Sequence, residues 1–349
     1  MAVDCLIVGG GQAGLAMAYQ LKQAGLSYRI LEASAQPGGS WPAYYDSLTL
    51  FSPARYSALP GLAFPGDPDG YPTRDAVVAY LRDYAQRFDI AVETNQRVTR
   101  VTRHGALFMA ETAAGSTIAA RSVVAASGAF SQPHMPGPAE LPGLSRFGGR
   151  VLHSKDYRSA AEFAGRRVVV IGGANSAVQI AHELTGASRV TLASRRRIRF
   201  VPQRILGRDF HFWIRASGLD FTPWLSDQST PVLDDGRYRR ALKDGVLQRR
   251  PMFEQVTEDG VVWADGSHER IDALVFATGF RPAVPYLAEF QPLSAQGQLR
   301  QRKGIATLTQ GLYFVGFPRQ RNFASATLRG VGPDAAHVLR HLQRYLQTA

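Results

Sequence analysis

The sequence predicts an α/β protein in which two similar strand–turn–helix–strand units form two domains, one inserted into the other. Residues 5–34 and 167–196 each read as an apolar strand, a glycine-rich turn, an amphipathic helix and a second strand. The apolar strands lack alternation, as expected of parallel strands buried on both faces. Further apolar strands and a final helix follow the second unit. We therefore expect an outer domain of residues 1–147 and 270–349 around an inserted domain of residues 148–269.

The first turn, GGGQAG, contains Gly9, Gly11, Gln12 and Gly14 in the pattern GxGxxG. The first glycine permits a tight turn, the second lets the backbone approach a pyrophosphate, and the third lets helix and strand pack closely. The helix N-terminus offers unpaired N–H groups to phosphates. Glu32 ends the second strand, where a carboxylate accepts hydrogen bonds from ribose hydroxyls. This unit is predicted to bind a dinucleotide with a free ribose diol, such as FAD.

A Pro/Gly-rich loop over 36–71 and several regular elements separate the two units. The stretch TRDAVVAYLRDYAQRF predicts a helix with Thr73 as its N-cap. Strands are predicted over 97–104, 107–112 and 116–127.

The second turn, GGANSA, contains Gly172, Ala174, Asn175 and Ser176. Glu32 lies 23 residues after Gly9, and the residue 23 positions after Gly172 is Arg195, which Arg196 follows. A guanidinium at this place binds a 2′-phosphate through a charge-assisted fork, which a carboxylate would repel. The second unit is therefore predicted to bind NADPH in preference to NADH, unless Arg195 is merely solvated. Both units are then Rossmann-like dinucleotide-binding domains, with the NADP domain inserted in the FAD domain.

The remaining segments carry weaker signals. The aromatic residues between Phe210 and Trp224 suit a pocket wall or lid, and equally an ordinary core or dimer contact. Residues 260–280 read as a hairpin leading into a buried strand, GLYFVGF reads as another strand, and residues 334–347 read as the final helix.

The composition is that of a globular protein with a strongly basic charge. Of 349 residues, 45% are apolar and 19% charged, and the net charge is +12. Seven arginines and a single acid, Asp209, lie between Arg195 and Arg215. Such a balance fits an anionic ligand, a nucleic acid or a basic surface. No helix-turn-helix or RNA-binding signature accompanies it, so no nucleic-acid partner is expected.

The chain has one cysteine, Cys5, and therefore neither an internal disulfide nor a CxxC redox pair. The uncharged run over 5–21 is short for a membrane span and lacks the basic start of a signal peptide. We expect a cytoplasmic protein with no membrane partner, and no metal site.

Three further motifs complete the pattern. Phe147, Gly149, His153 and Tyr157 fit the spacing FxGxxxHxxxY, and "ATGF" contains Thr278 and Gly279. The stretch "PGGSW" contains Gly39, Ser40 and Trp41. With these motifs the chain resembles class B flavin-dependent monooxygenases, a group that includes flavin-containing and Baeyer–Villiger monooxygenases, and most closely the short bacterial members.

The resemblance implies a glutathione-reductase-like architecture and a defined chemistry. NADPH reduces bound FAD, and O2 then forms a flavin hydroperoxide. One oxygen atom passes to the sulfur or nitrogen of a small organic substrate (as in sulfoxidation), or to a ketone in a Baeyer–Villiger oxidation.

The resemblance also implies roles for named residues. Those expected to contact the cofactors are Gly39, Ser40, Trp41, Phe147, Gly149, Tyr157, Thr278 and Gly279. His153 would link the domains and organise the nicotinamide site rather than act as a base. The segment 319–332 would pass the flavin ring, where Asn322 and Thr327 could bond its pyrimidine edge or simply cap a loop.

The sequence departs from the family at one catalytic position. Where many members have an asparagine beside the flavin, this chain has Phe51 or Ser52. Phe51 cannot donate a hydrogen bond, so leakage of hydrogen peroxide is expected. For the arginine of ketone-oxidising members, Arg55 is a candidate by position only, and a surface role suits it equally well. Heteroatom oxygenation is therefore the favoured reaction.

Two alternatives stay open at this point. One is an NAD(P)H oxidase or flavin reductase with weak oxygenation, and the other is a nucleic-acid-binding redox sensor. The expected partners are a small-molecule substrate and O2, with a homodimer as an open question.

Overall fold

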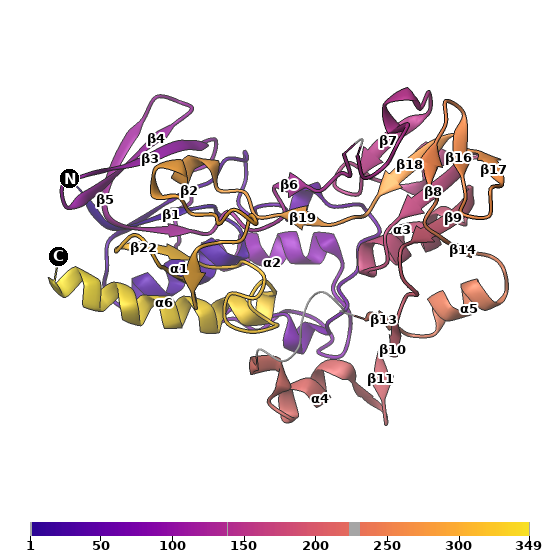
Figure 1. The fold of residues 1–349 in the computed structure, drawn as a ribbon. Coiled ribbons are helices and arrows are strands. Elements are labelled where there is room, and N and C mark those ends of the chain that lie inside the picture. Colours follow the sequence, from indigo (N-terminus) through magenta and orange to yellow (C-terminus); the bar gives the residue numbers. More distant parts are fainter. Residues whose placement is uncertain (1, 138, 223–230, 349) are drawn as a thin grey trace.

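The computed structural model describes residues 2–137, 139–222 and 231–348 and shows two α/β domains lying side by side (Figure 1). The first contains both ends of the described chain, and the second is formed by the middle of the sequence. The expected nested arrangement of the two domains is therefore confirmed.

The first domain is built on an eight-stranded sheet in which β2, β1, β5 and β22 run parallel. Helices α1, α2 and α6 pack on one face of these four parallel strands. Strands β3 and β4, which pair with the start of β5, cover the other face together with residues 284–290. Both faces are thus buried, which explains the unbroken apolar run of β1. The strands are β1 (Val3–Val8), β2 (Tyr28–Leu31), β3 (Val98–His104), β4 (Leu107–Thr112), β5 (Thr117–Ala125), β20 (Gln301–Arg302), β21 (Ile305–Ala306) and β22 (Leu312–Phe314). The helices are α1 (Gln12–Gln23), α2 (Arg74–Arg87) and α6 (Leu328–Thr348).

The second domain is built on a five-stranded parallel sheet in the order β14-β9-β8-β18-β7. Helices α3 and α5 cover one face, and a three-stranded antiparallel sheet covers the other. The parallel strands are β7 (Arg150–His153), β8 (Arg167–Ile171), β9 (Arg189–Ser194), β14 (Gln248–Pro251) and β18 (Ala273–Phe276). The helices are α3 (Asn175–Leu184) and α5 (Arg237–Lys243), and the covering strands are β15 (Gln255–Val256), β16 (Gly260–Val262) and β17 (His268–Arg270).

The expected domain boundaries need correction at both crossings. Strand β18 (Ala273–Phe276) pairs with β7 and β8, so it belongs to the inserted domain rather than to residues 270–349. Leu141 lies in the core of the inserted domain, although it precedes residue 148. The chain instead crosses where β6 (Gln132–Pro133) pairs with β19 (Phe280–Arg281), between the two domains in Figure 1. The expected boundaries therefore lie more than ten residues from the observed crossings, after the first crossing and before the second.

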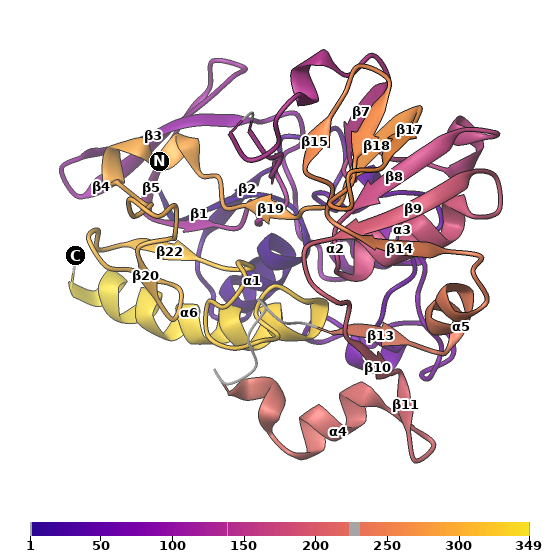
Figure 2. The ribbon, with the colours of Figure 1, turned by 45° about the vertical axis from the view of Figure 1, so that its right-hand side comes forward.

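An arm of the inserted domain reaches toward the first domain. It contains β10 (Phe200–Pro202), β11 (Arg204–Ile205), β12 (Arg208–Asp209), α4 (Phe210–Ala216) and β13 (Val232–Asp234). Both views show α4 at the bottom of the molecule, away from the five-stranded sheet (Figures 1 and 2). Of the aromatic stretch 210–224, Trp224 lies outside the described residues.

Helix α6 begins earlier than the expected residue 334. It runs from Leu328 to Thr348 and contains Pro333 in its second turn. The Val331 N–H already donates to Thr327 O, so the helix is established before the proline.

His337 on α6 gives the fold a pH dependence. Burial, aided by the positive charges of Arg321 and His341, lowers the pKa of His337 to about 4 from an ordinary 6.5. A histidine with a lowered folded-state pKa stabilises the fold above pH 6.5, and this contribution is lost as the pH falls toward 4. We expect His337→Gln to reduce the drop in melting temperature between pH 7 and pH 5. Exposed His104→Gln is the control, and equal drops in the two variants would contradict the prediction.

Candidate functional site

The first glycine turn has the backbone that a dinucleotide requires. Gly9 has φ of +112°, and a Cβ at Gly14 would lie 1.9 Å from Gly9 O. A Cβ at Gly11 would meet Gly39 Cα at 3.4 Å, Gly39 N at 3.7 Å and Gly38 O at 3.8 Å, which are ordinary contacts, so packing does not require this glycine. The bare backbone at Gly11 and the N-terminus of α1, which has no side-chain cap, together suit a pyrophosphate.

Glu32 is held at the carboxyl end of β2, beside this turn. The Gly10 N–H donates to its Oε2 at 2.6 Å, and the Ser34 N–H and hydroxyl donate to its Oε1 at 2.8 Å. The carboxylate is therefore fixed beside the turn, and its contact with a ribose hydroxyl stays a prediction.

The loop containing Gly39, Ser40 and Trp41 lies directly against the turn. A Cβ at Gly39 would approach Gly11 Cα to 3.0 Å, and the Trp41 indole N–H donates to Gln12 Oε1 at 3.0 Å. The Gln12 amide N–H in turn donates to Ala326 O at 2.9 Å, while Ser40 is exposed. One side chain, Gln12, thus joins the turn, the loop and the segment before α6, which together fit a bound FAD.

Asn322 and Thr327 use their side chains within their own turn. Asn322 Oδ1 accepts from the Ala324 N–H at 2.9 Å, and the Thr327 hydroxyl donates to Ala324 O at 2.7 Å. The loop-capping role is thus observed, and contact with the flavin ring stays a prediction.

The second turn repeats the first in the inserted domain. Gly172 has φ of +149°, and a Cβ there would lie 2.5 Å from Ala277 O. Ala174 is the N-cap of α3, which has no side-chain cap, and Asn175 and Ser176 begin the helix. The turn therefore offers unpaired backbone N–H groups to an anion.

Arg195 follows the end of β9 as directly as Glu32 follows the end of β2. Arg195, Arg196 and Arg197 are exposed, and none forms an ion pair within the described residues. The equal spacing in the sequence therefore corresponds to equal places in the two domains.

The structure separates the four residues of the FxGxxxHxxxY motif. Phe147 packs at the amino end of β7, where a Cβ at Gly149 would lie 2.4 Å from the Phe147 ring and 2.6 Å from Asp272 O. Nucleotides bind at the carboxyl ends of parallel strands, the opposite edge. Tyr157 is 0% exposed and stacks on Phe163 at 5.7 Å. In this structure all three residues are engaged in packing, and the expected contact of Phe147, Gly149 and Tyr157 with a cofactor stays a prediction.

His153 joins the two domains. Its Nε2–H donates to Gly279 O at 3.0 Å, and its Nδ1 accepts from the Lys155 N–H at 3.1 Å. Burial lowers the pKa of His153, so the ring is held neutral. The Thr278 hydroxyl donates to His134 O, which ties the same crossing together. The geometry agrees with a linking role and leaves neither ring nitrogen free for acid–base work.

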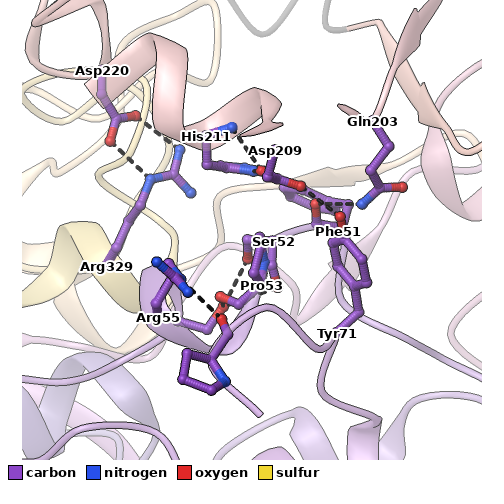
Figure 3. Close-up of polar contacts among 12 residues, drawn as sticks. Phe51, Ser52, Pro53, Arg55, Tyr71, Gln203, Asp209, His211, Asp220 and Arg329 are labelled. Carbon is purple, nitrogen blue, oxygen red and sulfur yellow. Dashed lines mark hydrogen bonds and ion pairs between the residues drawn. The ribbon is translucent and has the colours of Figure 1, made fainter. Parts of the chain in front are cut away.

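Phe51 and Ser52 lie where the arm meets the first domain (Figure 3). The Ser52 and Ser57 hydroxyls are hydrogen-bonded at 2.9 Å, and Phe51 O accepts from the Gln203 side chain at 3.0 Å. Arg55 forms a half-exposed ion pair with Asp69, which indicates a surface role.

A cavity of about 510 Å³ lies between the domains and includes Phe51 in its wall. Residues of the outer domain, of α3 and of the arm line it, among them Tyr71, Gln179, Gln203, Arg204 and Tyr238.

The sequence reasoning gave no role to the buried carboxylates of the arm, of which Asp209 and Asp220 contact the outer domain. Asp209 accepts from the Tyr71 hydroxyl at 2.6 Å and from His211 Nδ1 at 2.8 Å. Burial opposes its ionisation, yet these hydrogen bonds lower the pKa of Asp209, and burial lowers the pKa of His211. The centroid of the His211 ring lies 6.0 Å from that of the Phe51 ring and 6.1 Å from that of the Tyr56 ring, and both pairs are stacked. The available sequence signal for Asp209 was its position as the single acid between Arg195 and Arg215.

The second carboxylate, Asp220, forms a bidentate pair with Arg329 at the start of α6. Its oxygens accept from Arg329 Nε at 2.9 Å and Nη2 at 2.8 Å, with both side chains buried (Figure 3). This pair attaches the arm to the outer domain.

Two negative findings accompany the site. Cys5 is buried, which raises its pKa to about 12, and it is the only cysteine of the chain. The sequence therefore offers no dithiol for disulfide reduction. Within residues 2–137, 139–222 and 231–348, no helix is long and apolar enough to cross a membrane.

Known proteins resemble the chain over nearly its whole length. Residues 6–316 match the family model described as pyridine nucleotide-disulphide oxidoreductase. An uncharacterized CzcO-like oxidoreductase of Geobacillus kaustophilus is 33% identical, covering 97% of this chain and 98% of the relative. Indole-3-pyruvate monooxygenase YUCCA4 of Oryza sativa is 29% identical, covering 98% and 87%. A solved flavin-containing monooxygenase from Stenotrophomonas maltophilia is 33% identical with a TM-score of 0.88, covering 99% of each chain. The two nucleotide turns and these matches show that the chain belongs to the flavin monooxygenases of the pyridine nucleotide-disulphide oxidoreductase family.

Proposed function

We propose that this enzyme uses NADPH, bound FAD and O2 to insert one oxygen atom into a small organic substrate, at a sulfur or nitrogen atom. The observation that carries the proposal is the contrast between the two domains. In the outer domain an acid, Glu32, directly follows β2, and in the inserted domain a base, Arg195, directly follows β9. The acid suits the free ribose diol of FAD, and the base suits the 2′-phosphate of NADPH.

The residues of the chain supply binding and orientation. FAD, when bound, supplies hydride acceptance and the activation of O2. Gly9, Gly11 and Glu32 would hold it, with Gln12 fixing the neighbouring loop. The Gly172 turn and Arg195 would hold NADPH.

The cavity between the domains is our candidate for the substrate. Its volume of about 510 Å³ suits a small organic molecule, and both domains contribute to its wall. Arg55 pairs with Asp69 at the surface, which leaves ketone oxidation without its candidate arginine and supports heteroatom oxygenation.

The experiment measures stoichiometry. The purified protein is expected to be yellow and to convert an alkyl aryl sulfide to its sulfoxide, with NADPH and O2 consumed together. The ratio of sulfoxide to NADPH separates this proposal from the second candidate, an NAD(P)H oxidase. Phe51 at the position of an expected hydrogen-bond donor favours partial release of hydrogen peroxide. Release of peroxide equal to all NADPH consumed, without sulfoxide, would favour the oxidase.

Arg195→Ala tests the proposed cofactor preference. We expect kcat/KM for NADPH to fall by roughly tenfold to a hundredfold, because a charge-assisted contact to the 2′-phosphate is lost. The value for NADH should stay within about twofold, since NADH lacks that phosphate. Steady-state kinetics with both cofactors measure the effect, and equal losses for both would contradict the assignment.

A further inference from the structure

Arg249 on strand β14 holds the arginine loop at the end of β9. Its Nε–H donates to Ser194 Oγ at 2.9 Å, and its Nη2–H donates to Ser194 O at 2.9 Å and to Arg196 O at 3.1 Å. Ser194 Oγ donates to Arg196 O at 2.9 Å, which closes the turn. One guanidinium therefore binds three acceptors in the two residues that flank Arg195.

Among the described residues, only Arg249 and Ser194 donate side-chain hydrogen bonds to the backbone of residues 194–196. Arg195, Arg196 and Arg197 are exposed and lack ion-pair partners across the described parts of the chain. Three adjacent like charges repel one another, and a free loop would lose conformational entropy when its arginines gather on one phosphate. When Arg249 fixes the carbonyl groups of the loop, most of this conformational entropy has been lost before the phosphate binds. The held loop should therefore bind the phosphate more tightly than a free loop would.

We infer that Arg249 is a positioning residue that determines specificity for the 2′-phosphate of the pyridine nucleotide, acting through the 194–196 turn. The inference rests on the proposed use of NADPH. Arg249 lies 53 positions beyond Arg196, and only the parallel pairing of β14 with β9 brings the two together.

The neighbouring Arg250 provides a matched control. It lies on the same strand, but its Nη2 contacts Asp265 at 2.6 Å and its guanidinium covers the Trp263 ring at 4.3 Å. Within the described chain, the hydrogen bonds and ion pairs of the Arg250 side chain do not reach the 194–196 turn. Loss of Arg250 therefore tests for general effects of removing a cation from this strand.

The experiment is calorimetric titration of the FAD-loaded protein with NADP⁺ and with NAD⁺, which differ only in the 2′-phosphate. The readout is the ratio of the Kd for NAD⁺ to the Kd for NADP⁺. We expect Arg249→Ala to lower this ratio roughly tenfold while the Kd for NAD⁺ changes little. Arg249→Lys should lose most of the ratio as well, because an ammonium keeps the charge but cannot form the fork. Arg250→Ala should keep the ratio of the natural protein.

Three results would overturn the inference. An unchanged ratio in Arg249→Ala would show that the turn needs no such support. If the ratio is unchanged but both nucleotides bind more weakly, Arg249 has a general structural role instead. A ratio retained in Arg249→Lys would assign the effect to charge alone. A ratio of one in the natural protein would instead refute the NADPH preference itself, and the inference with it.

Discussion

Replacement of Asp220 by alanine is expected to lower the free energy of unfolding by about 3–5 kcal/mol. Asp220 and Arg329 form a bidentate pair with side chains only 2% and 4% exposed. Removing the acid leaves a buried guanidinium without a counter-charge, and Arg329 Nη1 already has no hydrogen-bond partner within the described residues. Urea unfolding followed by circular dichroism measures the change.

Two companion variants make this result specific. Asp235→Ala removes the acid of a pair whose side chains are 44% and 55% exposed, so a loss below about 1 kcal/mol is expected. The double variant Asp220→Leu, Arg329→Met removes both buried charges and should recover most of the lost stability. If Asp220→Ala behaves like Asp235→Ala, the pair does not attach the arm in solution.

Gly14→Ala and Gly11→Ala are expected to fail in different ways. The alanine Cβ at position 14 would lie 1.9 Å from Gly9 O, a backbone atom that moves only with the turn. We expect a loss of stability of at least about 3 kcal/mol, with little soluble protein and no bound flavin. At position 11 the Cβ meets only an ordinary contact, so the variant should fold. Its FAD affinity should drop at least roughly tenfold, because the methyl group occupies the place of the pyrophosphate.

Circular dichroism and the ratio of flavin to protein absorbance separate the two outcomes. Gly137→Ala is the control, since a Cβ there meets no atom within 4 Å. A Gly11→Ala protein that retains full flavin, or a Gly14→Ala protein as stable as the natural one, would argue against this account of the turn.

The sequence predicted correctly those parts of the protein whose residues lie close to one another along the chain. The turn at Gly9, its helix and Glu32 lie within one βαβ unit, so local spacing sufficed to place them. The same reasoning placed Arg195 at the end of β9 and Thr73 at the cap of α2, where its hydroxyl accepts from the Ala76 N–H.

The parts that sequence reasoning missed depend on contacts between distant segments. Asp220 and Arg329 are 109 positions apart, and Tyr71 and Asp209 are 138 apart. No local periodicity encodes such pairs. The motif residues Phe147 and Tyr157 differ in kind, since a recurrent spacing shows that positions matter but not whether they serve packing, as observed here, or a ligand.

The nested chain path has a consequence for how the protein is made. Strand β5 ends at Ala125, yet its parallel partner β22 begins only at Leu312, after the whole inserted sheet. During synthesis the inserted domain is therefore complete while the outer domain still lacks its central strand β22 and the long helix α6. The inserted domain can fold as soon as its residues have been synthesised. The outer domain can complete its sheet only after residues distant in the sequence have been added, so we expect its folding to be the slower step.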